Sequence, residues 1–168
     1  TGALFRIEAP DTLAVVGAGA VGMEFADIYS AYGTQVTVLE ALDRILPLED
    51  ADSSAAVERS FKKRGVNIHT GAVVEGADVA KQSVKLKFTD RTGEQRTLKV
   101  EYVLSAVGRV PNTEDLGLEA AGVQLDDQGF FVVDEYMRTS AVGVYAIGDC
   151  AGRQLLAHKA MHEGVICV

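Results

Sequence analysis

The stretch LAVVGAGAVGMEFADIYSAYGTQVTVLE, residues 13–40, decides the fold. An apolar run, Leu13–Val16, leads directly into the glycine-rich sequence Gly17–Gly22. Apolar residues then recur with helical spacing, and a second apolar run, Val36–Leu39, follows. Glu40 comes directly after that run, 18 positions beyond the last glycine of the turn. This order predicts a buried strand, a glycine-rich turn, a helix, a second buried strand and an acid at its end.

Each glycine of the turn has a physical role in binding a dinucleotide. Gly17 allows a tight turn out of the strand, Gly19 lets a pyrophosphate approach the backbone, and Gly22 lets the helix pack on the sheet. The free N–H groups and the positive end of the helix dipole favour the phosphates. Glu40 can accept hydrogen bonds from both ribose hydroxyls and repels a 2′-phosphate, which favours NAD over NADP, although the nearby Arg44 weakens that preference. A turn with a purely structural role is the alternative.

Length, composition and charge exclude several classes of protein. The 168 residues predict one domain, or one domain plus part of another, and 48% apolar content is enough to bury a core. The net charge is −8 and the longest basic run is Lys62–Arg64, so nucleic acid is not an expected partner. No run reaches the about 18 apolar residues of a membrane span. The two cysteines match no disulfide framework, which favours a cytoplasmic location, or the mitochondrial matrix in a eukaryote. Because the chain begins at Thr1 without Met, we expect a piece of a longer protein.

The next elements continue an α/β pattern. We expect the first helix to bury Val21, Phe25, Ile28, Tyr29 and Tyr32. A second helix is expected over 53–64, with Ala56, Val57 and Phe61 buried, and a third strand over 66–68. Residues 84–88 and 98–100 alternate apolar and charged side chains, so we expect residues 73–100 to form a small antiparallel β-meander in place of a crossover helix. A fourth parallel strand is expected over 102–107. The predicted fold is a Rossmann-like, doubly wound parallel sheet with this meander as its crossover.

The remainder of the chain predicts four further elements. It contains a short helix over 115–121, strands over 130–133 and 144–147, and a final helix over 157–168. We therefore expect one domain over residues 1–112 and a linker with part of a second domain over residues 113–168.

Four stretches in this order resemble motifs of the pyridine nucleotide–disulfide oxidoreductases. They are GAGAVGMEFA (17–26), SAVGRVPNT (105–113), TSAVGVYAIGDCAG (139–152) and LLAHKAMHEG (155–164). The first resembles the NAD motif of the family, and the third resembles its second flavin motif. Residues 39–47 and 156–160 are most similar to the members that oxidise dihydrolipoamide with NAD. The resemblance covers essentially the whole chain.

The resemblance implies two sets of cofactor-binding residues. The NAD set is Gly17, Ala18, Gly19, Ala20, Val21, Gly22, Glu24, Glu40, Val74 and Gly108. The FAD set, used in the full-length parent, is Asp149, Leu155, Leu156, Ala157 and His158. Glu24, expected on the first turn of the helix, is expected to bind the nicotinamide carboxamide, Val74 to pack on the adenine, and Gly108 to lie against the nicotinamide half. The structural alternatives are an acid favoured by the helix dipole for Glu24, an ordinary core residue for Val74 and a turn glycine for Gly108. His158 and His162 have helical spacing but no third ligand, so we expect no metal site.

The resemblance also implies what this chain lacks and what its parent does. The flavin-binding N-terminal motif with a redox CxxxxC, and the C-terminal domain with a catalytic His–Glu pair, are absent from this sequence. We therefore expect no catalytic residue here and no activity of the piece alone. The implied parent is a FAD-dependent homodimer that passes hydride to NAD, in a 2-oxo acid dehydrogenase complex. Another family member, such as one that reduces mercuric ion, an NAD-binding module without chemistry, and a structural domain without nucleotide are the alternatives.

Overall fold

The structure is a computed structural model that describes residues 8–168. The chain divides into two compact units, the first ending at Gly108 and the second beginning at Arg109. Each unit is described by itself. The boundary lies in the loop that follows the last strand of the first unit.

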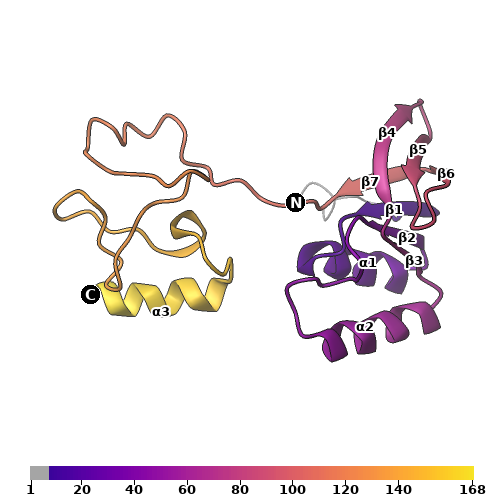
Figure 1. The fold of residues 1–168 in the computed structure, drawn as a ribbon, viewed down its shortest axis with the longest axis horizontal. Helices are drawn as coiled ribbons and strands as arrows, with labels where there is room; N and C mark the ends of the chain where they lie inside the picture. The colour runs from indigo at the N-terminus through magenta and orange to yellow at the C-terminus, as the bar shows by residue number, and fades with distance from the viewer. Residues whose placement is uncertain (1–7) are drawn as a thin grey trace. The chain divides into compact units, whose positions relative to one another are not determined.

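A four-stranded parallel sheet is the centre of the described part of the N-terminal unit, in the order β3-β2-β1-β7 (Figure 1). Its strands are β1 (Thr12–Val16), β2 (Gln35–Glu40), β3 (Asn67–Thr70) and β7 (Tyr102–Ser105). The helices α1 (Ala20–Ala31) and α2 (Ala51–Lys63) connect the first three strands and confirm the predicted alternation. Val16 of β1 pairs with Leu39 of β2 and with Ser105 of β7. The glycine-rich turn and Glu40 therefore leave the sheet at the same edge.

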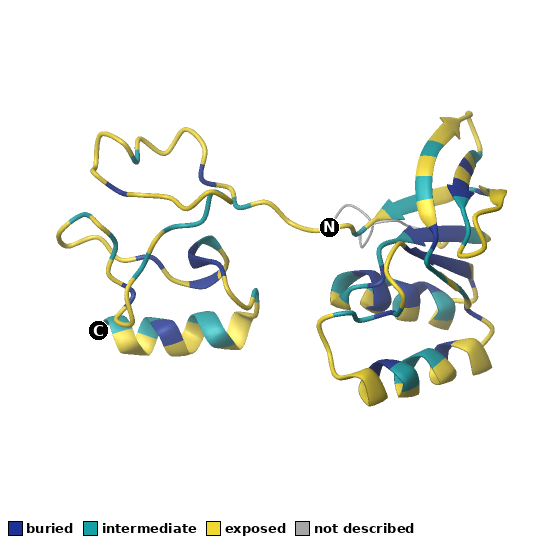
Figure 2. Cartoon of the chain, viewed as in Figure 1, coloured by how far each residue is buried: buried dark blue, intermediate teal, exposed yellow. Residues whose placement is uncertain are grey.

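Both faces of this sheet are covered. Successive side chains of a strand point to opposite faces, so β1 and β2 supply two separate cores. The helix-side core contains Leu13, Val15, Ala18, Met23, Ala26, Tyr29, Val36, Val38, Ile45, Phe61 and Val66. The meander-side core contains Ala14, Leu39, Ala72, Leu86, Phe88 and Val100. Figure 2 shows the resulting concentration of buried residues along β1 and β2.

The predicted apolar face of the first helix is partly wrong. Its buried residues are Gly22, Met23, Ala26 and Tyr29, whereas Tyr32 follows the last helical residue and is 77% exposed. Gly22 and Ala26 let α1 approach the sheet closely, while Tyr29 is buried as predicted and Phe25 is partly buried against the same core. In α2, Phe61 is buried as predicted, but Ser54 is buried where Ala56 was expected and Ala56 is exposed.

The predicted β-meander is confirmed. It consists of β4 (Val73–Val79), β5 (Val84–Thr89) and β6 (Gln95–Val100), paired antiparallel in that order. The register shifts between Val74 and Gly76. Leu86 and Phe88 point into the meander-side core, while Lys85 and Lys87 are exposed, as the alternation requires.

The C-terminal unit has much less regular structure than predicted. The final helix forms as α3 (Ala157–Cys167), and a short 3-10 helix, η2, covers Gly148–Ala151. The strands predicted over 130–133 and 144–147 are wrong: these segments make isolated bridges, Leu125 with Phe131 and Arg138 with Tyr145. A strand needs a continuous ladder with a neighbour, and these segments have none among the described residues. The helix predicted over 115–121 is also wrong, because Asp115 and Gly117 have positive φ angles of 57° and 69°.

Candidate functional site

Two glycines of the turn are required by the fold itself. Gly17 has a φ of +94°, and a Cβ there would lie 2.6 Å from the Ala106 carbonyl oxygen, just beyond β7. A Cβ on Gly22 would lie 2.0 Å from the Gly17 carbonyl oxygen. Both approaches are far shorter than a van der Waals contact. Gly17 and Gly22 therefore allow α1 and the turn to pack against the end of the sheet, as the sequence predicts.

Gly19 has no comparable structural requirement. Its φ of −69° and ψ of −178° are open to other residues. A Cβ built on Gly19 would meet no atom within 4 Å. Gly19 is the N-cap of α1, where the first N–H groups of the helix have no intrahelical acceptor. The turn therefore presents free donors beside an open space, which is a cradle of the kind that a pyrophosphate fills.

Glu40 is buried at the end of β2, with only 7% of its surface exposed. Its Oε2 accepts a hydrogen bond of 2.6 Å from the Ala18 N–H, and its Oε1 accepts one of 2.9 Å from the Leu42 N–H. The carboxylate thus connects the glycine-rich turn to the loop after β2. A carboxylate has about four acceptor positions, so two remain for a ligand.

Arg44 is engaged away from this carboxylate. Its Nη2 donates to the carbonyl oxygens of Pro47 and Glu49, over 2.9 and 3.1 Å. The guanidinium therefore fastens the loop to which it belongs. The hydrogen bonds described for Arg44 go to loop carbonyls, whereas those described for Glu40 come from the Ala18 and Leu42 N–H groups.

The other predicted NAD residues lie around the turn or on the adjacent strands. Ala18 is fully buried, and Ala20 and Val21 are the first two residues of α1. Glu24 is exposed on α1, but the first turn of α1 holds no acid, so Glu24 does not lie there as expected and the dipole explains it less well. Val74 packs against the meander-side core, and its neighbour Val73 is 52% exposed. Gly108 has a φ of +141° with open space at its Cβ position.

The predicted FAD residues gather around η2 and the start of α3. A cavity of about 290 Å³ brings together Asp149, Leu155, Arg109 and Phe130, with four further residues. Arg109 Nη1 donates to Asp149 Oδ2 over 3.1 Å, in an ion pair that is about half exposed on both sides. Leu156 is the N-cap of α3, and Ala157 and His158 are its first exposed residues. Arg109 was not among the residues that the sequence singled out for this site.

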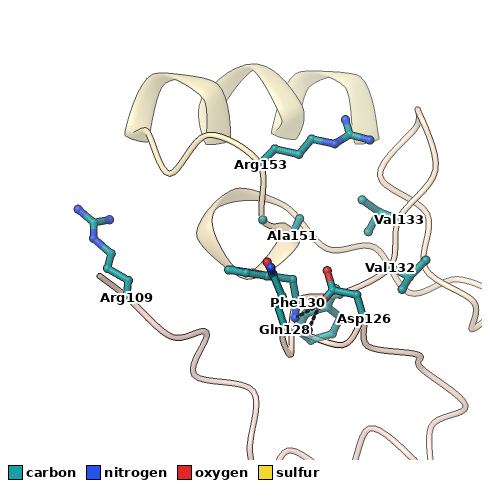
Figure 3. A pocket seen from close by; sticks show the side chains of 10 residues that line it. Arg109, Asp126, Gln128, Phe130, Val132, Val133, Ala151 and Arg153 are labelled. Atoms are coloured by element: carbon teal, nitrogen blue, oxygen red, sulfur yellow. Dashed lines mark hydrogen bonds between the residues drawn. The ribbon is translucent and has the colours of Figure 1, made fainter. Parts of the chain in front are cut away.

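A second cavity, of about 610 Å³, lies beside the first in the C-terminal unit (Figure 3). Its lining combines Phe130 and Val133 with two arginines, Arg109 and Arg153. The Asp126 carboxylate accepts hydrogen bonds of 2.9 Å from the N–H groups of both Gln128 and Phe130. Asp126 therefore fixes the turn that forms one wall of the cavity.

A buried ion pair joins α3 to η2. Lys159 Nζ lies 2.9 Å from Glu163 Oε1, with side-chain exposures of 15% and 8%. Glu163 Oε2 accepts from the Gly148 N–H over 2.8 Å, and Lys159 Nζ donates to the Gly152 carbonyl over 2.8 Å. Burial raises the pKa of Glu163, but the Gly148 N–H and the Lys159 ammonium outweigh it and hold the pKa below its usual value. The sequence contained a signal for this pair, because the residues are four apart on a predicted helix.

The described residues contain neither a grouped metal-ligand set nor a membrane-spanning helix. Among residues 8–168, no three His, Cys, Asp or Glu side chains are grouped to hold a metal ion. No helix in that range is both long enough and apolar enough to cross a membrane.

The parallel sheet, the open glycine-rich turn at the ends of β1 and β7, and the buried acid at the end of β2 together define an α/β domain with a Rossmann-like parallel sheet. Comparison with known proteins makes the class specific. The family model described as pyridine nucleotide-disulphide oxidoreductase matches residues 1–164. The chain belongs to this family, as its motifs predicted.

Its relatives are dihydrolipoyl dehydrogenases and flavoprotein disulfide reductases. The chain is 43% identical over 159 residues to dihydrolipoyl dehydrogenase of Rhizobium etli, covering 95% of this chain and 33% of that protein. For the Bacillus subtilis enzyme the identity is 42% over 167 residues, covering 99% and 35%. Among solved structures, LpdA from Mycobacterium tuberculosis has a TM-score of 0.84 at 40% identity, covering 96% of this chain and 34% of LpdA. The Cu(II) complex of the HOCl-induced flavoprotein disulfide reductase RclA from Escherichia coli has a TM-score of 0.88 at 32% identity, covering 99% and 37%.

The chain thus spans about a third of the length of the curated relatives that it matches. The names of the family and of its solved members specify a pyridine nucleotide and a flavin, which agrees with the predicted cofactors NAD and FAD. The similarity supports an oxidoreductase as the parent of this chain.

Proposed function

We propose that this chain is the NAD(H)-binding part of a FAD-dependent disulfide oxidoreductase of the dihydrolipoyl dehydrogenase kind. The observation that carries the proposal is the pairing of an open Gly19 with a buried Glu40 at one edge of the sheet. The open turn suits a pyrophosphate, and the carboxylate, with two acceptor positions left, suits the two ribose hydroxyls. The predicted domain over 1–112 has the role of holding the nicotinamide, and 113–168 the role of one wall of the flavin site.

In the parent protein, the proposed reaction is the oxidation of dihydrolipoamide to lipoamide with reduction of NAD to NADH. The nicotinamide supplies a hydride acceptor when it is bound. The residues of this chain bind and orient the cofactors, and no catalytic residue is assigned to it. Relatives named dihydrolipoyl dehydrogenase, at 42–43% identity, support this member of the family. A homodimeric parent within a 2-oxo acid dehydrogenase complex, located in the cytoplasm or the mitochondrial matrix, stays a prediction.

Two other functions follow from the same residues. The chain could act by itself as an NAD-binding module without catalysis, since its turn and acid need no other domain to bind a nucleotide. Another family member, such as mercuric reductase, would share the cofactor site and differ in its substrate. The burial of Glu40 and the engagement of Arg44 by loop carbonyls both disfavour a member that uses NADP.

The test is the ratio of the affinities for NADH and NADPH, measured by calorimetry. Like charges about 4 Å apart repel by about 1–4 kcal/mol in a partly buried site, so NADH should bind at least about fivefold more tightly. In Glu40→Gln the ratio should fall toward one, whatever happens to the absolute affinities, because the repelling charge is gone. Glu49→Gln removes an exposed acid of the same loop and should keep the original ratio. Equal binding of both nucleotides by the unmodified chain, or binding of neither, would overturn the proposal.

A further inference from the structure

The loop over residues 41–50, between β2 and α2, is fastened directly to the glycine-rich turn. The Leu46 N–H donates to the Ala18 carbonyl oxygen over 2.7 Å. The Ala18 N–H in turn donates to Glu40 Oε2. Both backbone polar groups of Ala18, a fully buried residue, are therefore held in place from outside the turn.

Holding the Ala18 carbonyl also orients a donor that faces the proposed ligand. The Ala18 carbonyl and the Gly19 N–H belong to one planar trans peptide group, in which the C=O and the N–H point in opposite directions. A carbonyl fixed toward Leu46 therefore directs the Gly19 N–H to the opposite side. Gly19 is the N-cap beside the open space, so the direction of this N–H decides whether a phosphate oxygen can accept from it.

Leu46 adopts an unfavourable backbone conformation to make this contact. Its φ is +46°, which costs a residue with a side chain about 1–2 kcal/mol. Such strain persists where surrounding contacts over-determine it. The Leu46 carbonyl accepts from the Ser54 hydroxyl over 3.1 Å and from the Glu49 N–H over 2.9 Å. The Ser54 hydroxyl belongs to a residue of α2 that is only 2% exposed.

A second set of hydrogen bonds, made by the side chain of Arg44 within the loop itself, holds the same loop. Arg44 Nη2 donates to the carbonyl oxygens of Pro47 and Glu49, so it closes the segment that carries Leu46. Ile45 is fully buried in the helix-side core and anchors the segment between them. Ser54 thus holds Leu46 directly, through its carbonyl, whereas Arg44 holds the segment that follows Leu46.

We infer that Ser54 and Arg44 are positioning residues for the pyrophosphate subsite, acting through Leu46 on the Ala18–Gly19 peptide. The inference rests on the proposed function, because the ligand of the turn is then a dinucleotide. It assigns a role to the loop over residues 41–50 that is separate from ribose recognition by Glu40. Neither side chain touches the ligand in this assignment.

The first experiment compares ligands that contain a pyrophosphate with one that does not. Ser54→Ala and Arg44→Met each remove one tether, and Ser60→Ala and Arg59→Met are matched controls at exposed positions of α2. Losing one tether should weaken NADH and ADP-ribose about three- to tenfold, by calorimetry, and leave adenosine within about twofold. The controls should bind all three as the unmodified chain does. Unchanged NADH binding in both variants, or an equal loss for adenosine, would overturn the inference.

A second experiment needs no ligand and separates this inference from the proposed function. Hydrogen exchange by NMR should find the Leu46 amide protected in the unmodified chain and exchanging at least about tenfold faster in Ser54→Ala, while that variant stays folded. Fast exchange in the unmodified chain would overturn the inference even if NADH binds. An unmodified chain with a protected Leu46 amide that fails to bind NADH would overturn the proposed function, and the positioning role with it.

Discussion

Replacing Gly19 with valine separates what the fold requires from what a ligand requires. The backbone angles of Gly19, φ −69° and ψ −178°, are accessible to a β-branched residue. The position of the missing Cβ has no protein atom within 4 Å. The chain should therefore fold with valine at this position, and the valine methyl groups should occupy the space proposed for the pyrophosphate.

The expected magnitudes differ widely between folding and binding. Folding should lose only a few tenths of a kcal/mol to about 1 kcal/mol, the usual cost of an apolar residue at an N-cap. Binding should lose the charge-assisted hydrogen bonds between the turn and a phosphate, about 1.5–3 kcal/mol. That loss corresponds to roughly a 10- to 150-fold increase in the Kd for NADH.

The assay combines thermal unfolding by circular dichroism with calorimetric titration of NADH. Gly22→Ala serves as the contrasting variant, because its Cβ would lie 2.0 Å from the Gly17 carbonyl oxygen and must disturb the fold. We expect Gly19→Val to melt within a few degrees of the unmodified chain, and Gly22→Ala to melt well below both. A folded Gly19→Val chain with an unchanged Kd for NADH would refute the reasoning, and so would a Gly19→Val chain that does not fold.

Two further predictions concern the C-terminal unit. The pKa of Glu163 is held below its usual value, so its ion pair stabilises the fold fully above the ordinary glutamate pKa of about 4.5, and this stability is lost as the pH falls through the lower folded-state value. Urea unfolding between pH 3 and 7 should reveal that dependence, and Glu163→Gln should flatten it; an unchanged slope in the variant would contradict the assignment. The chain alone should neither retain FAD nor oxidise dihydrolipoamide, because Asp149 and the start of α3 provide one wall for a flavin. Flavin absorbance near one equivalent after desalting, or turnover above a blank, would contradict this expectation.

The sequence predicted the N-terminal unit well because its signals are local and repeated. Buried strands of a parallel sheet read as short apolar runs, and Leu13–Val16 and Val36–Leu39 both do. The meander followed from strict alternation, which Val84–Thr89 displays with Lys85 and Lys87 outward. The turn residues were identified with their structural roles, since the close approaches at Gly17 and Gly22 are those that the motif anticipates.

The C-terminal unit was predicted less well for a physical reason. Apolar runs such as Phe130–Val133 and Val144–Ile147 favour strands, but a strand forms only where a neighbour completes its hydrogen bonds. The described residues supply single bridges there, and Val132, Val144 and Ile147 remain 38–45% exposed. Local pattern identifies the tendency of a segment, whereas pairing depends on residues elsewhere in the structure.

The contacts that position the candidate site could not be predicted from local sequence patterns, because they join residues far apart in the chain. Leu46 reaches Ala18 across 28 positions, and Glu40 reaches it across 22. Nothing in the sequence around Ser54 marks it as buried, and helical spacing favoured Ala56 instead. The sequence therefore predicted residues that are proposed to contact a nucleotide, but it did not predict the side chains that hold the loop and the turn in place.

Glu40 connects the glycine-rich turn to the loop after β2, and this connection limits how the proposed preference for NAD over NADP can change. Its Oε1 and Oε2 accept from the Leu42 and Ala18 N–H groups, so its side-chain oxygens are needed by the turn as well as by the ribose in the proposed function. Replacing it with arginine would remove the repulsion of a 2′-phosphate but leave the buried Ala18 N–H without an acceptor, at a cost of about 1–3 kcal/mol. A residue without a side-chain acceptor at position 40 therefore weakens the glycine-rich turn while it relaxes the proposed choice of ribose. A chain of this fold that prefers NADP must supply another acceptor for the Ala18 N–H before it can replace the acid.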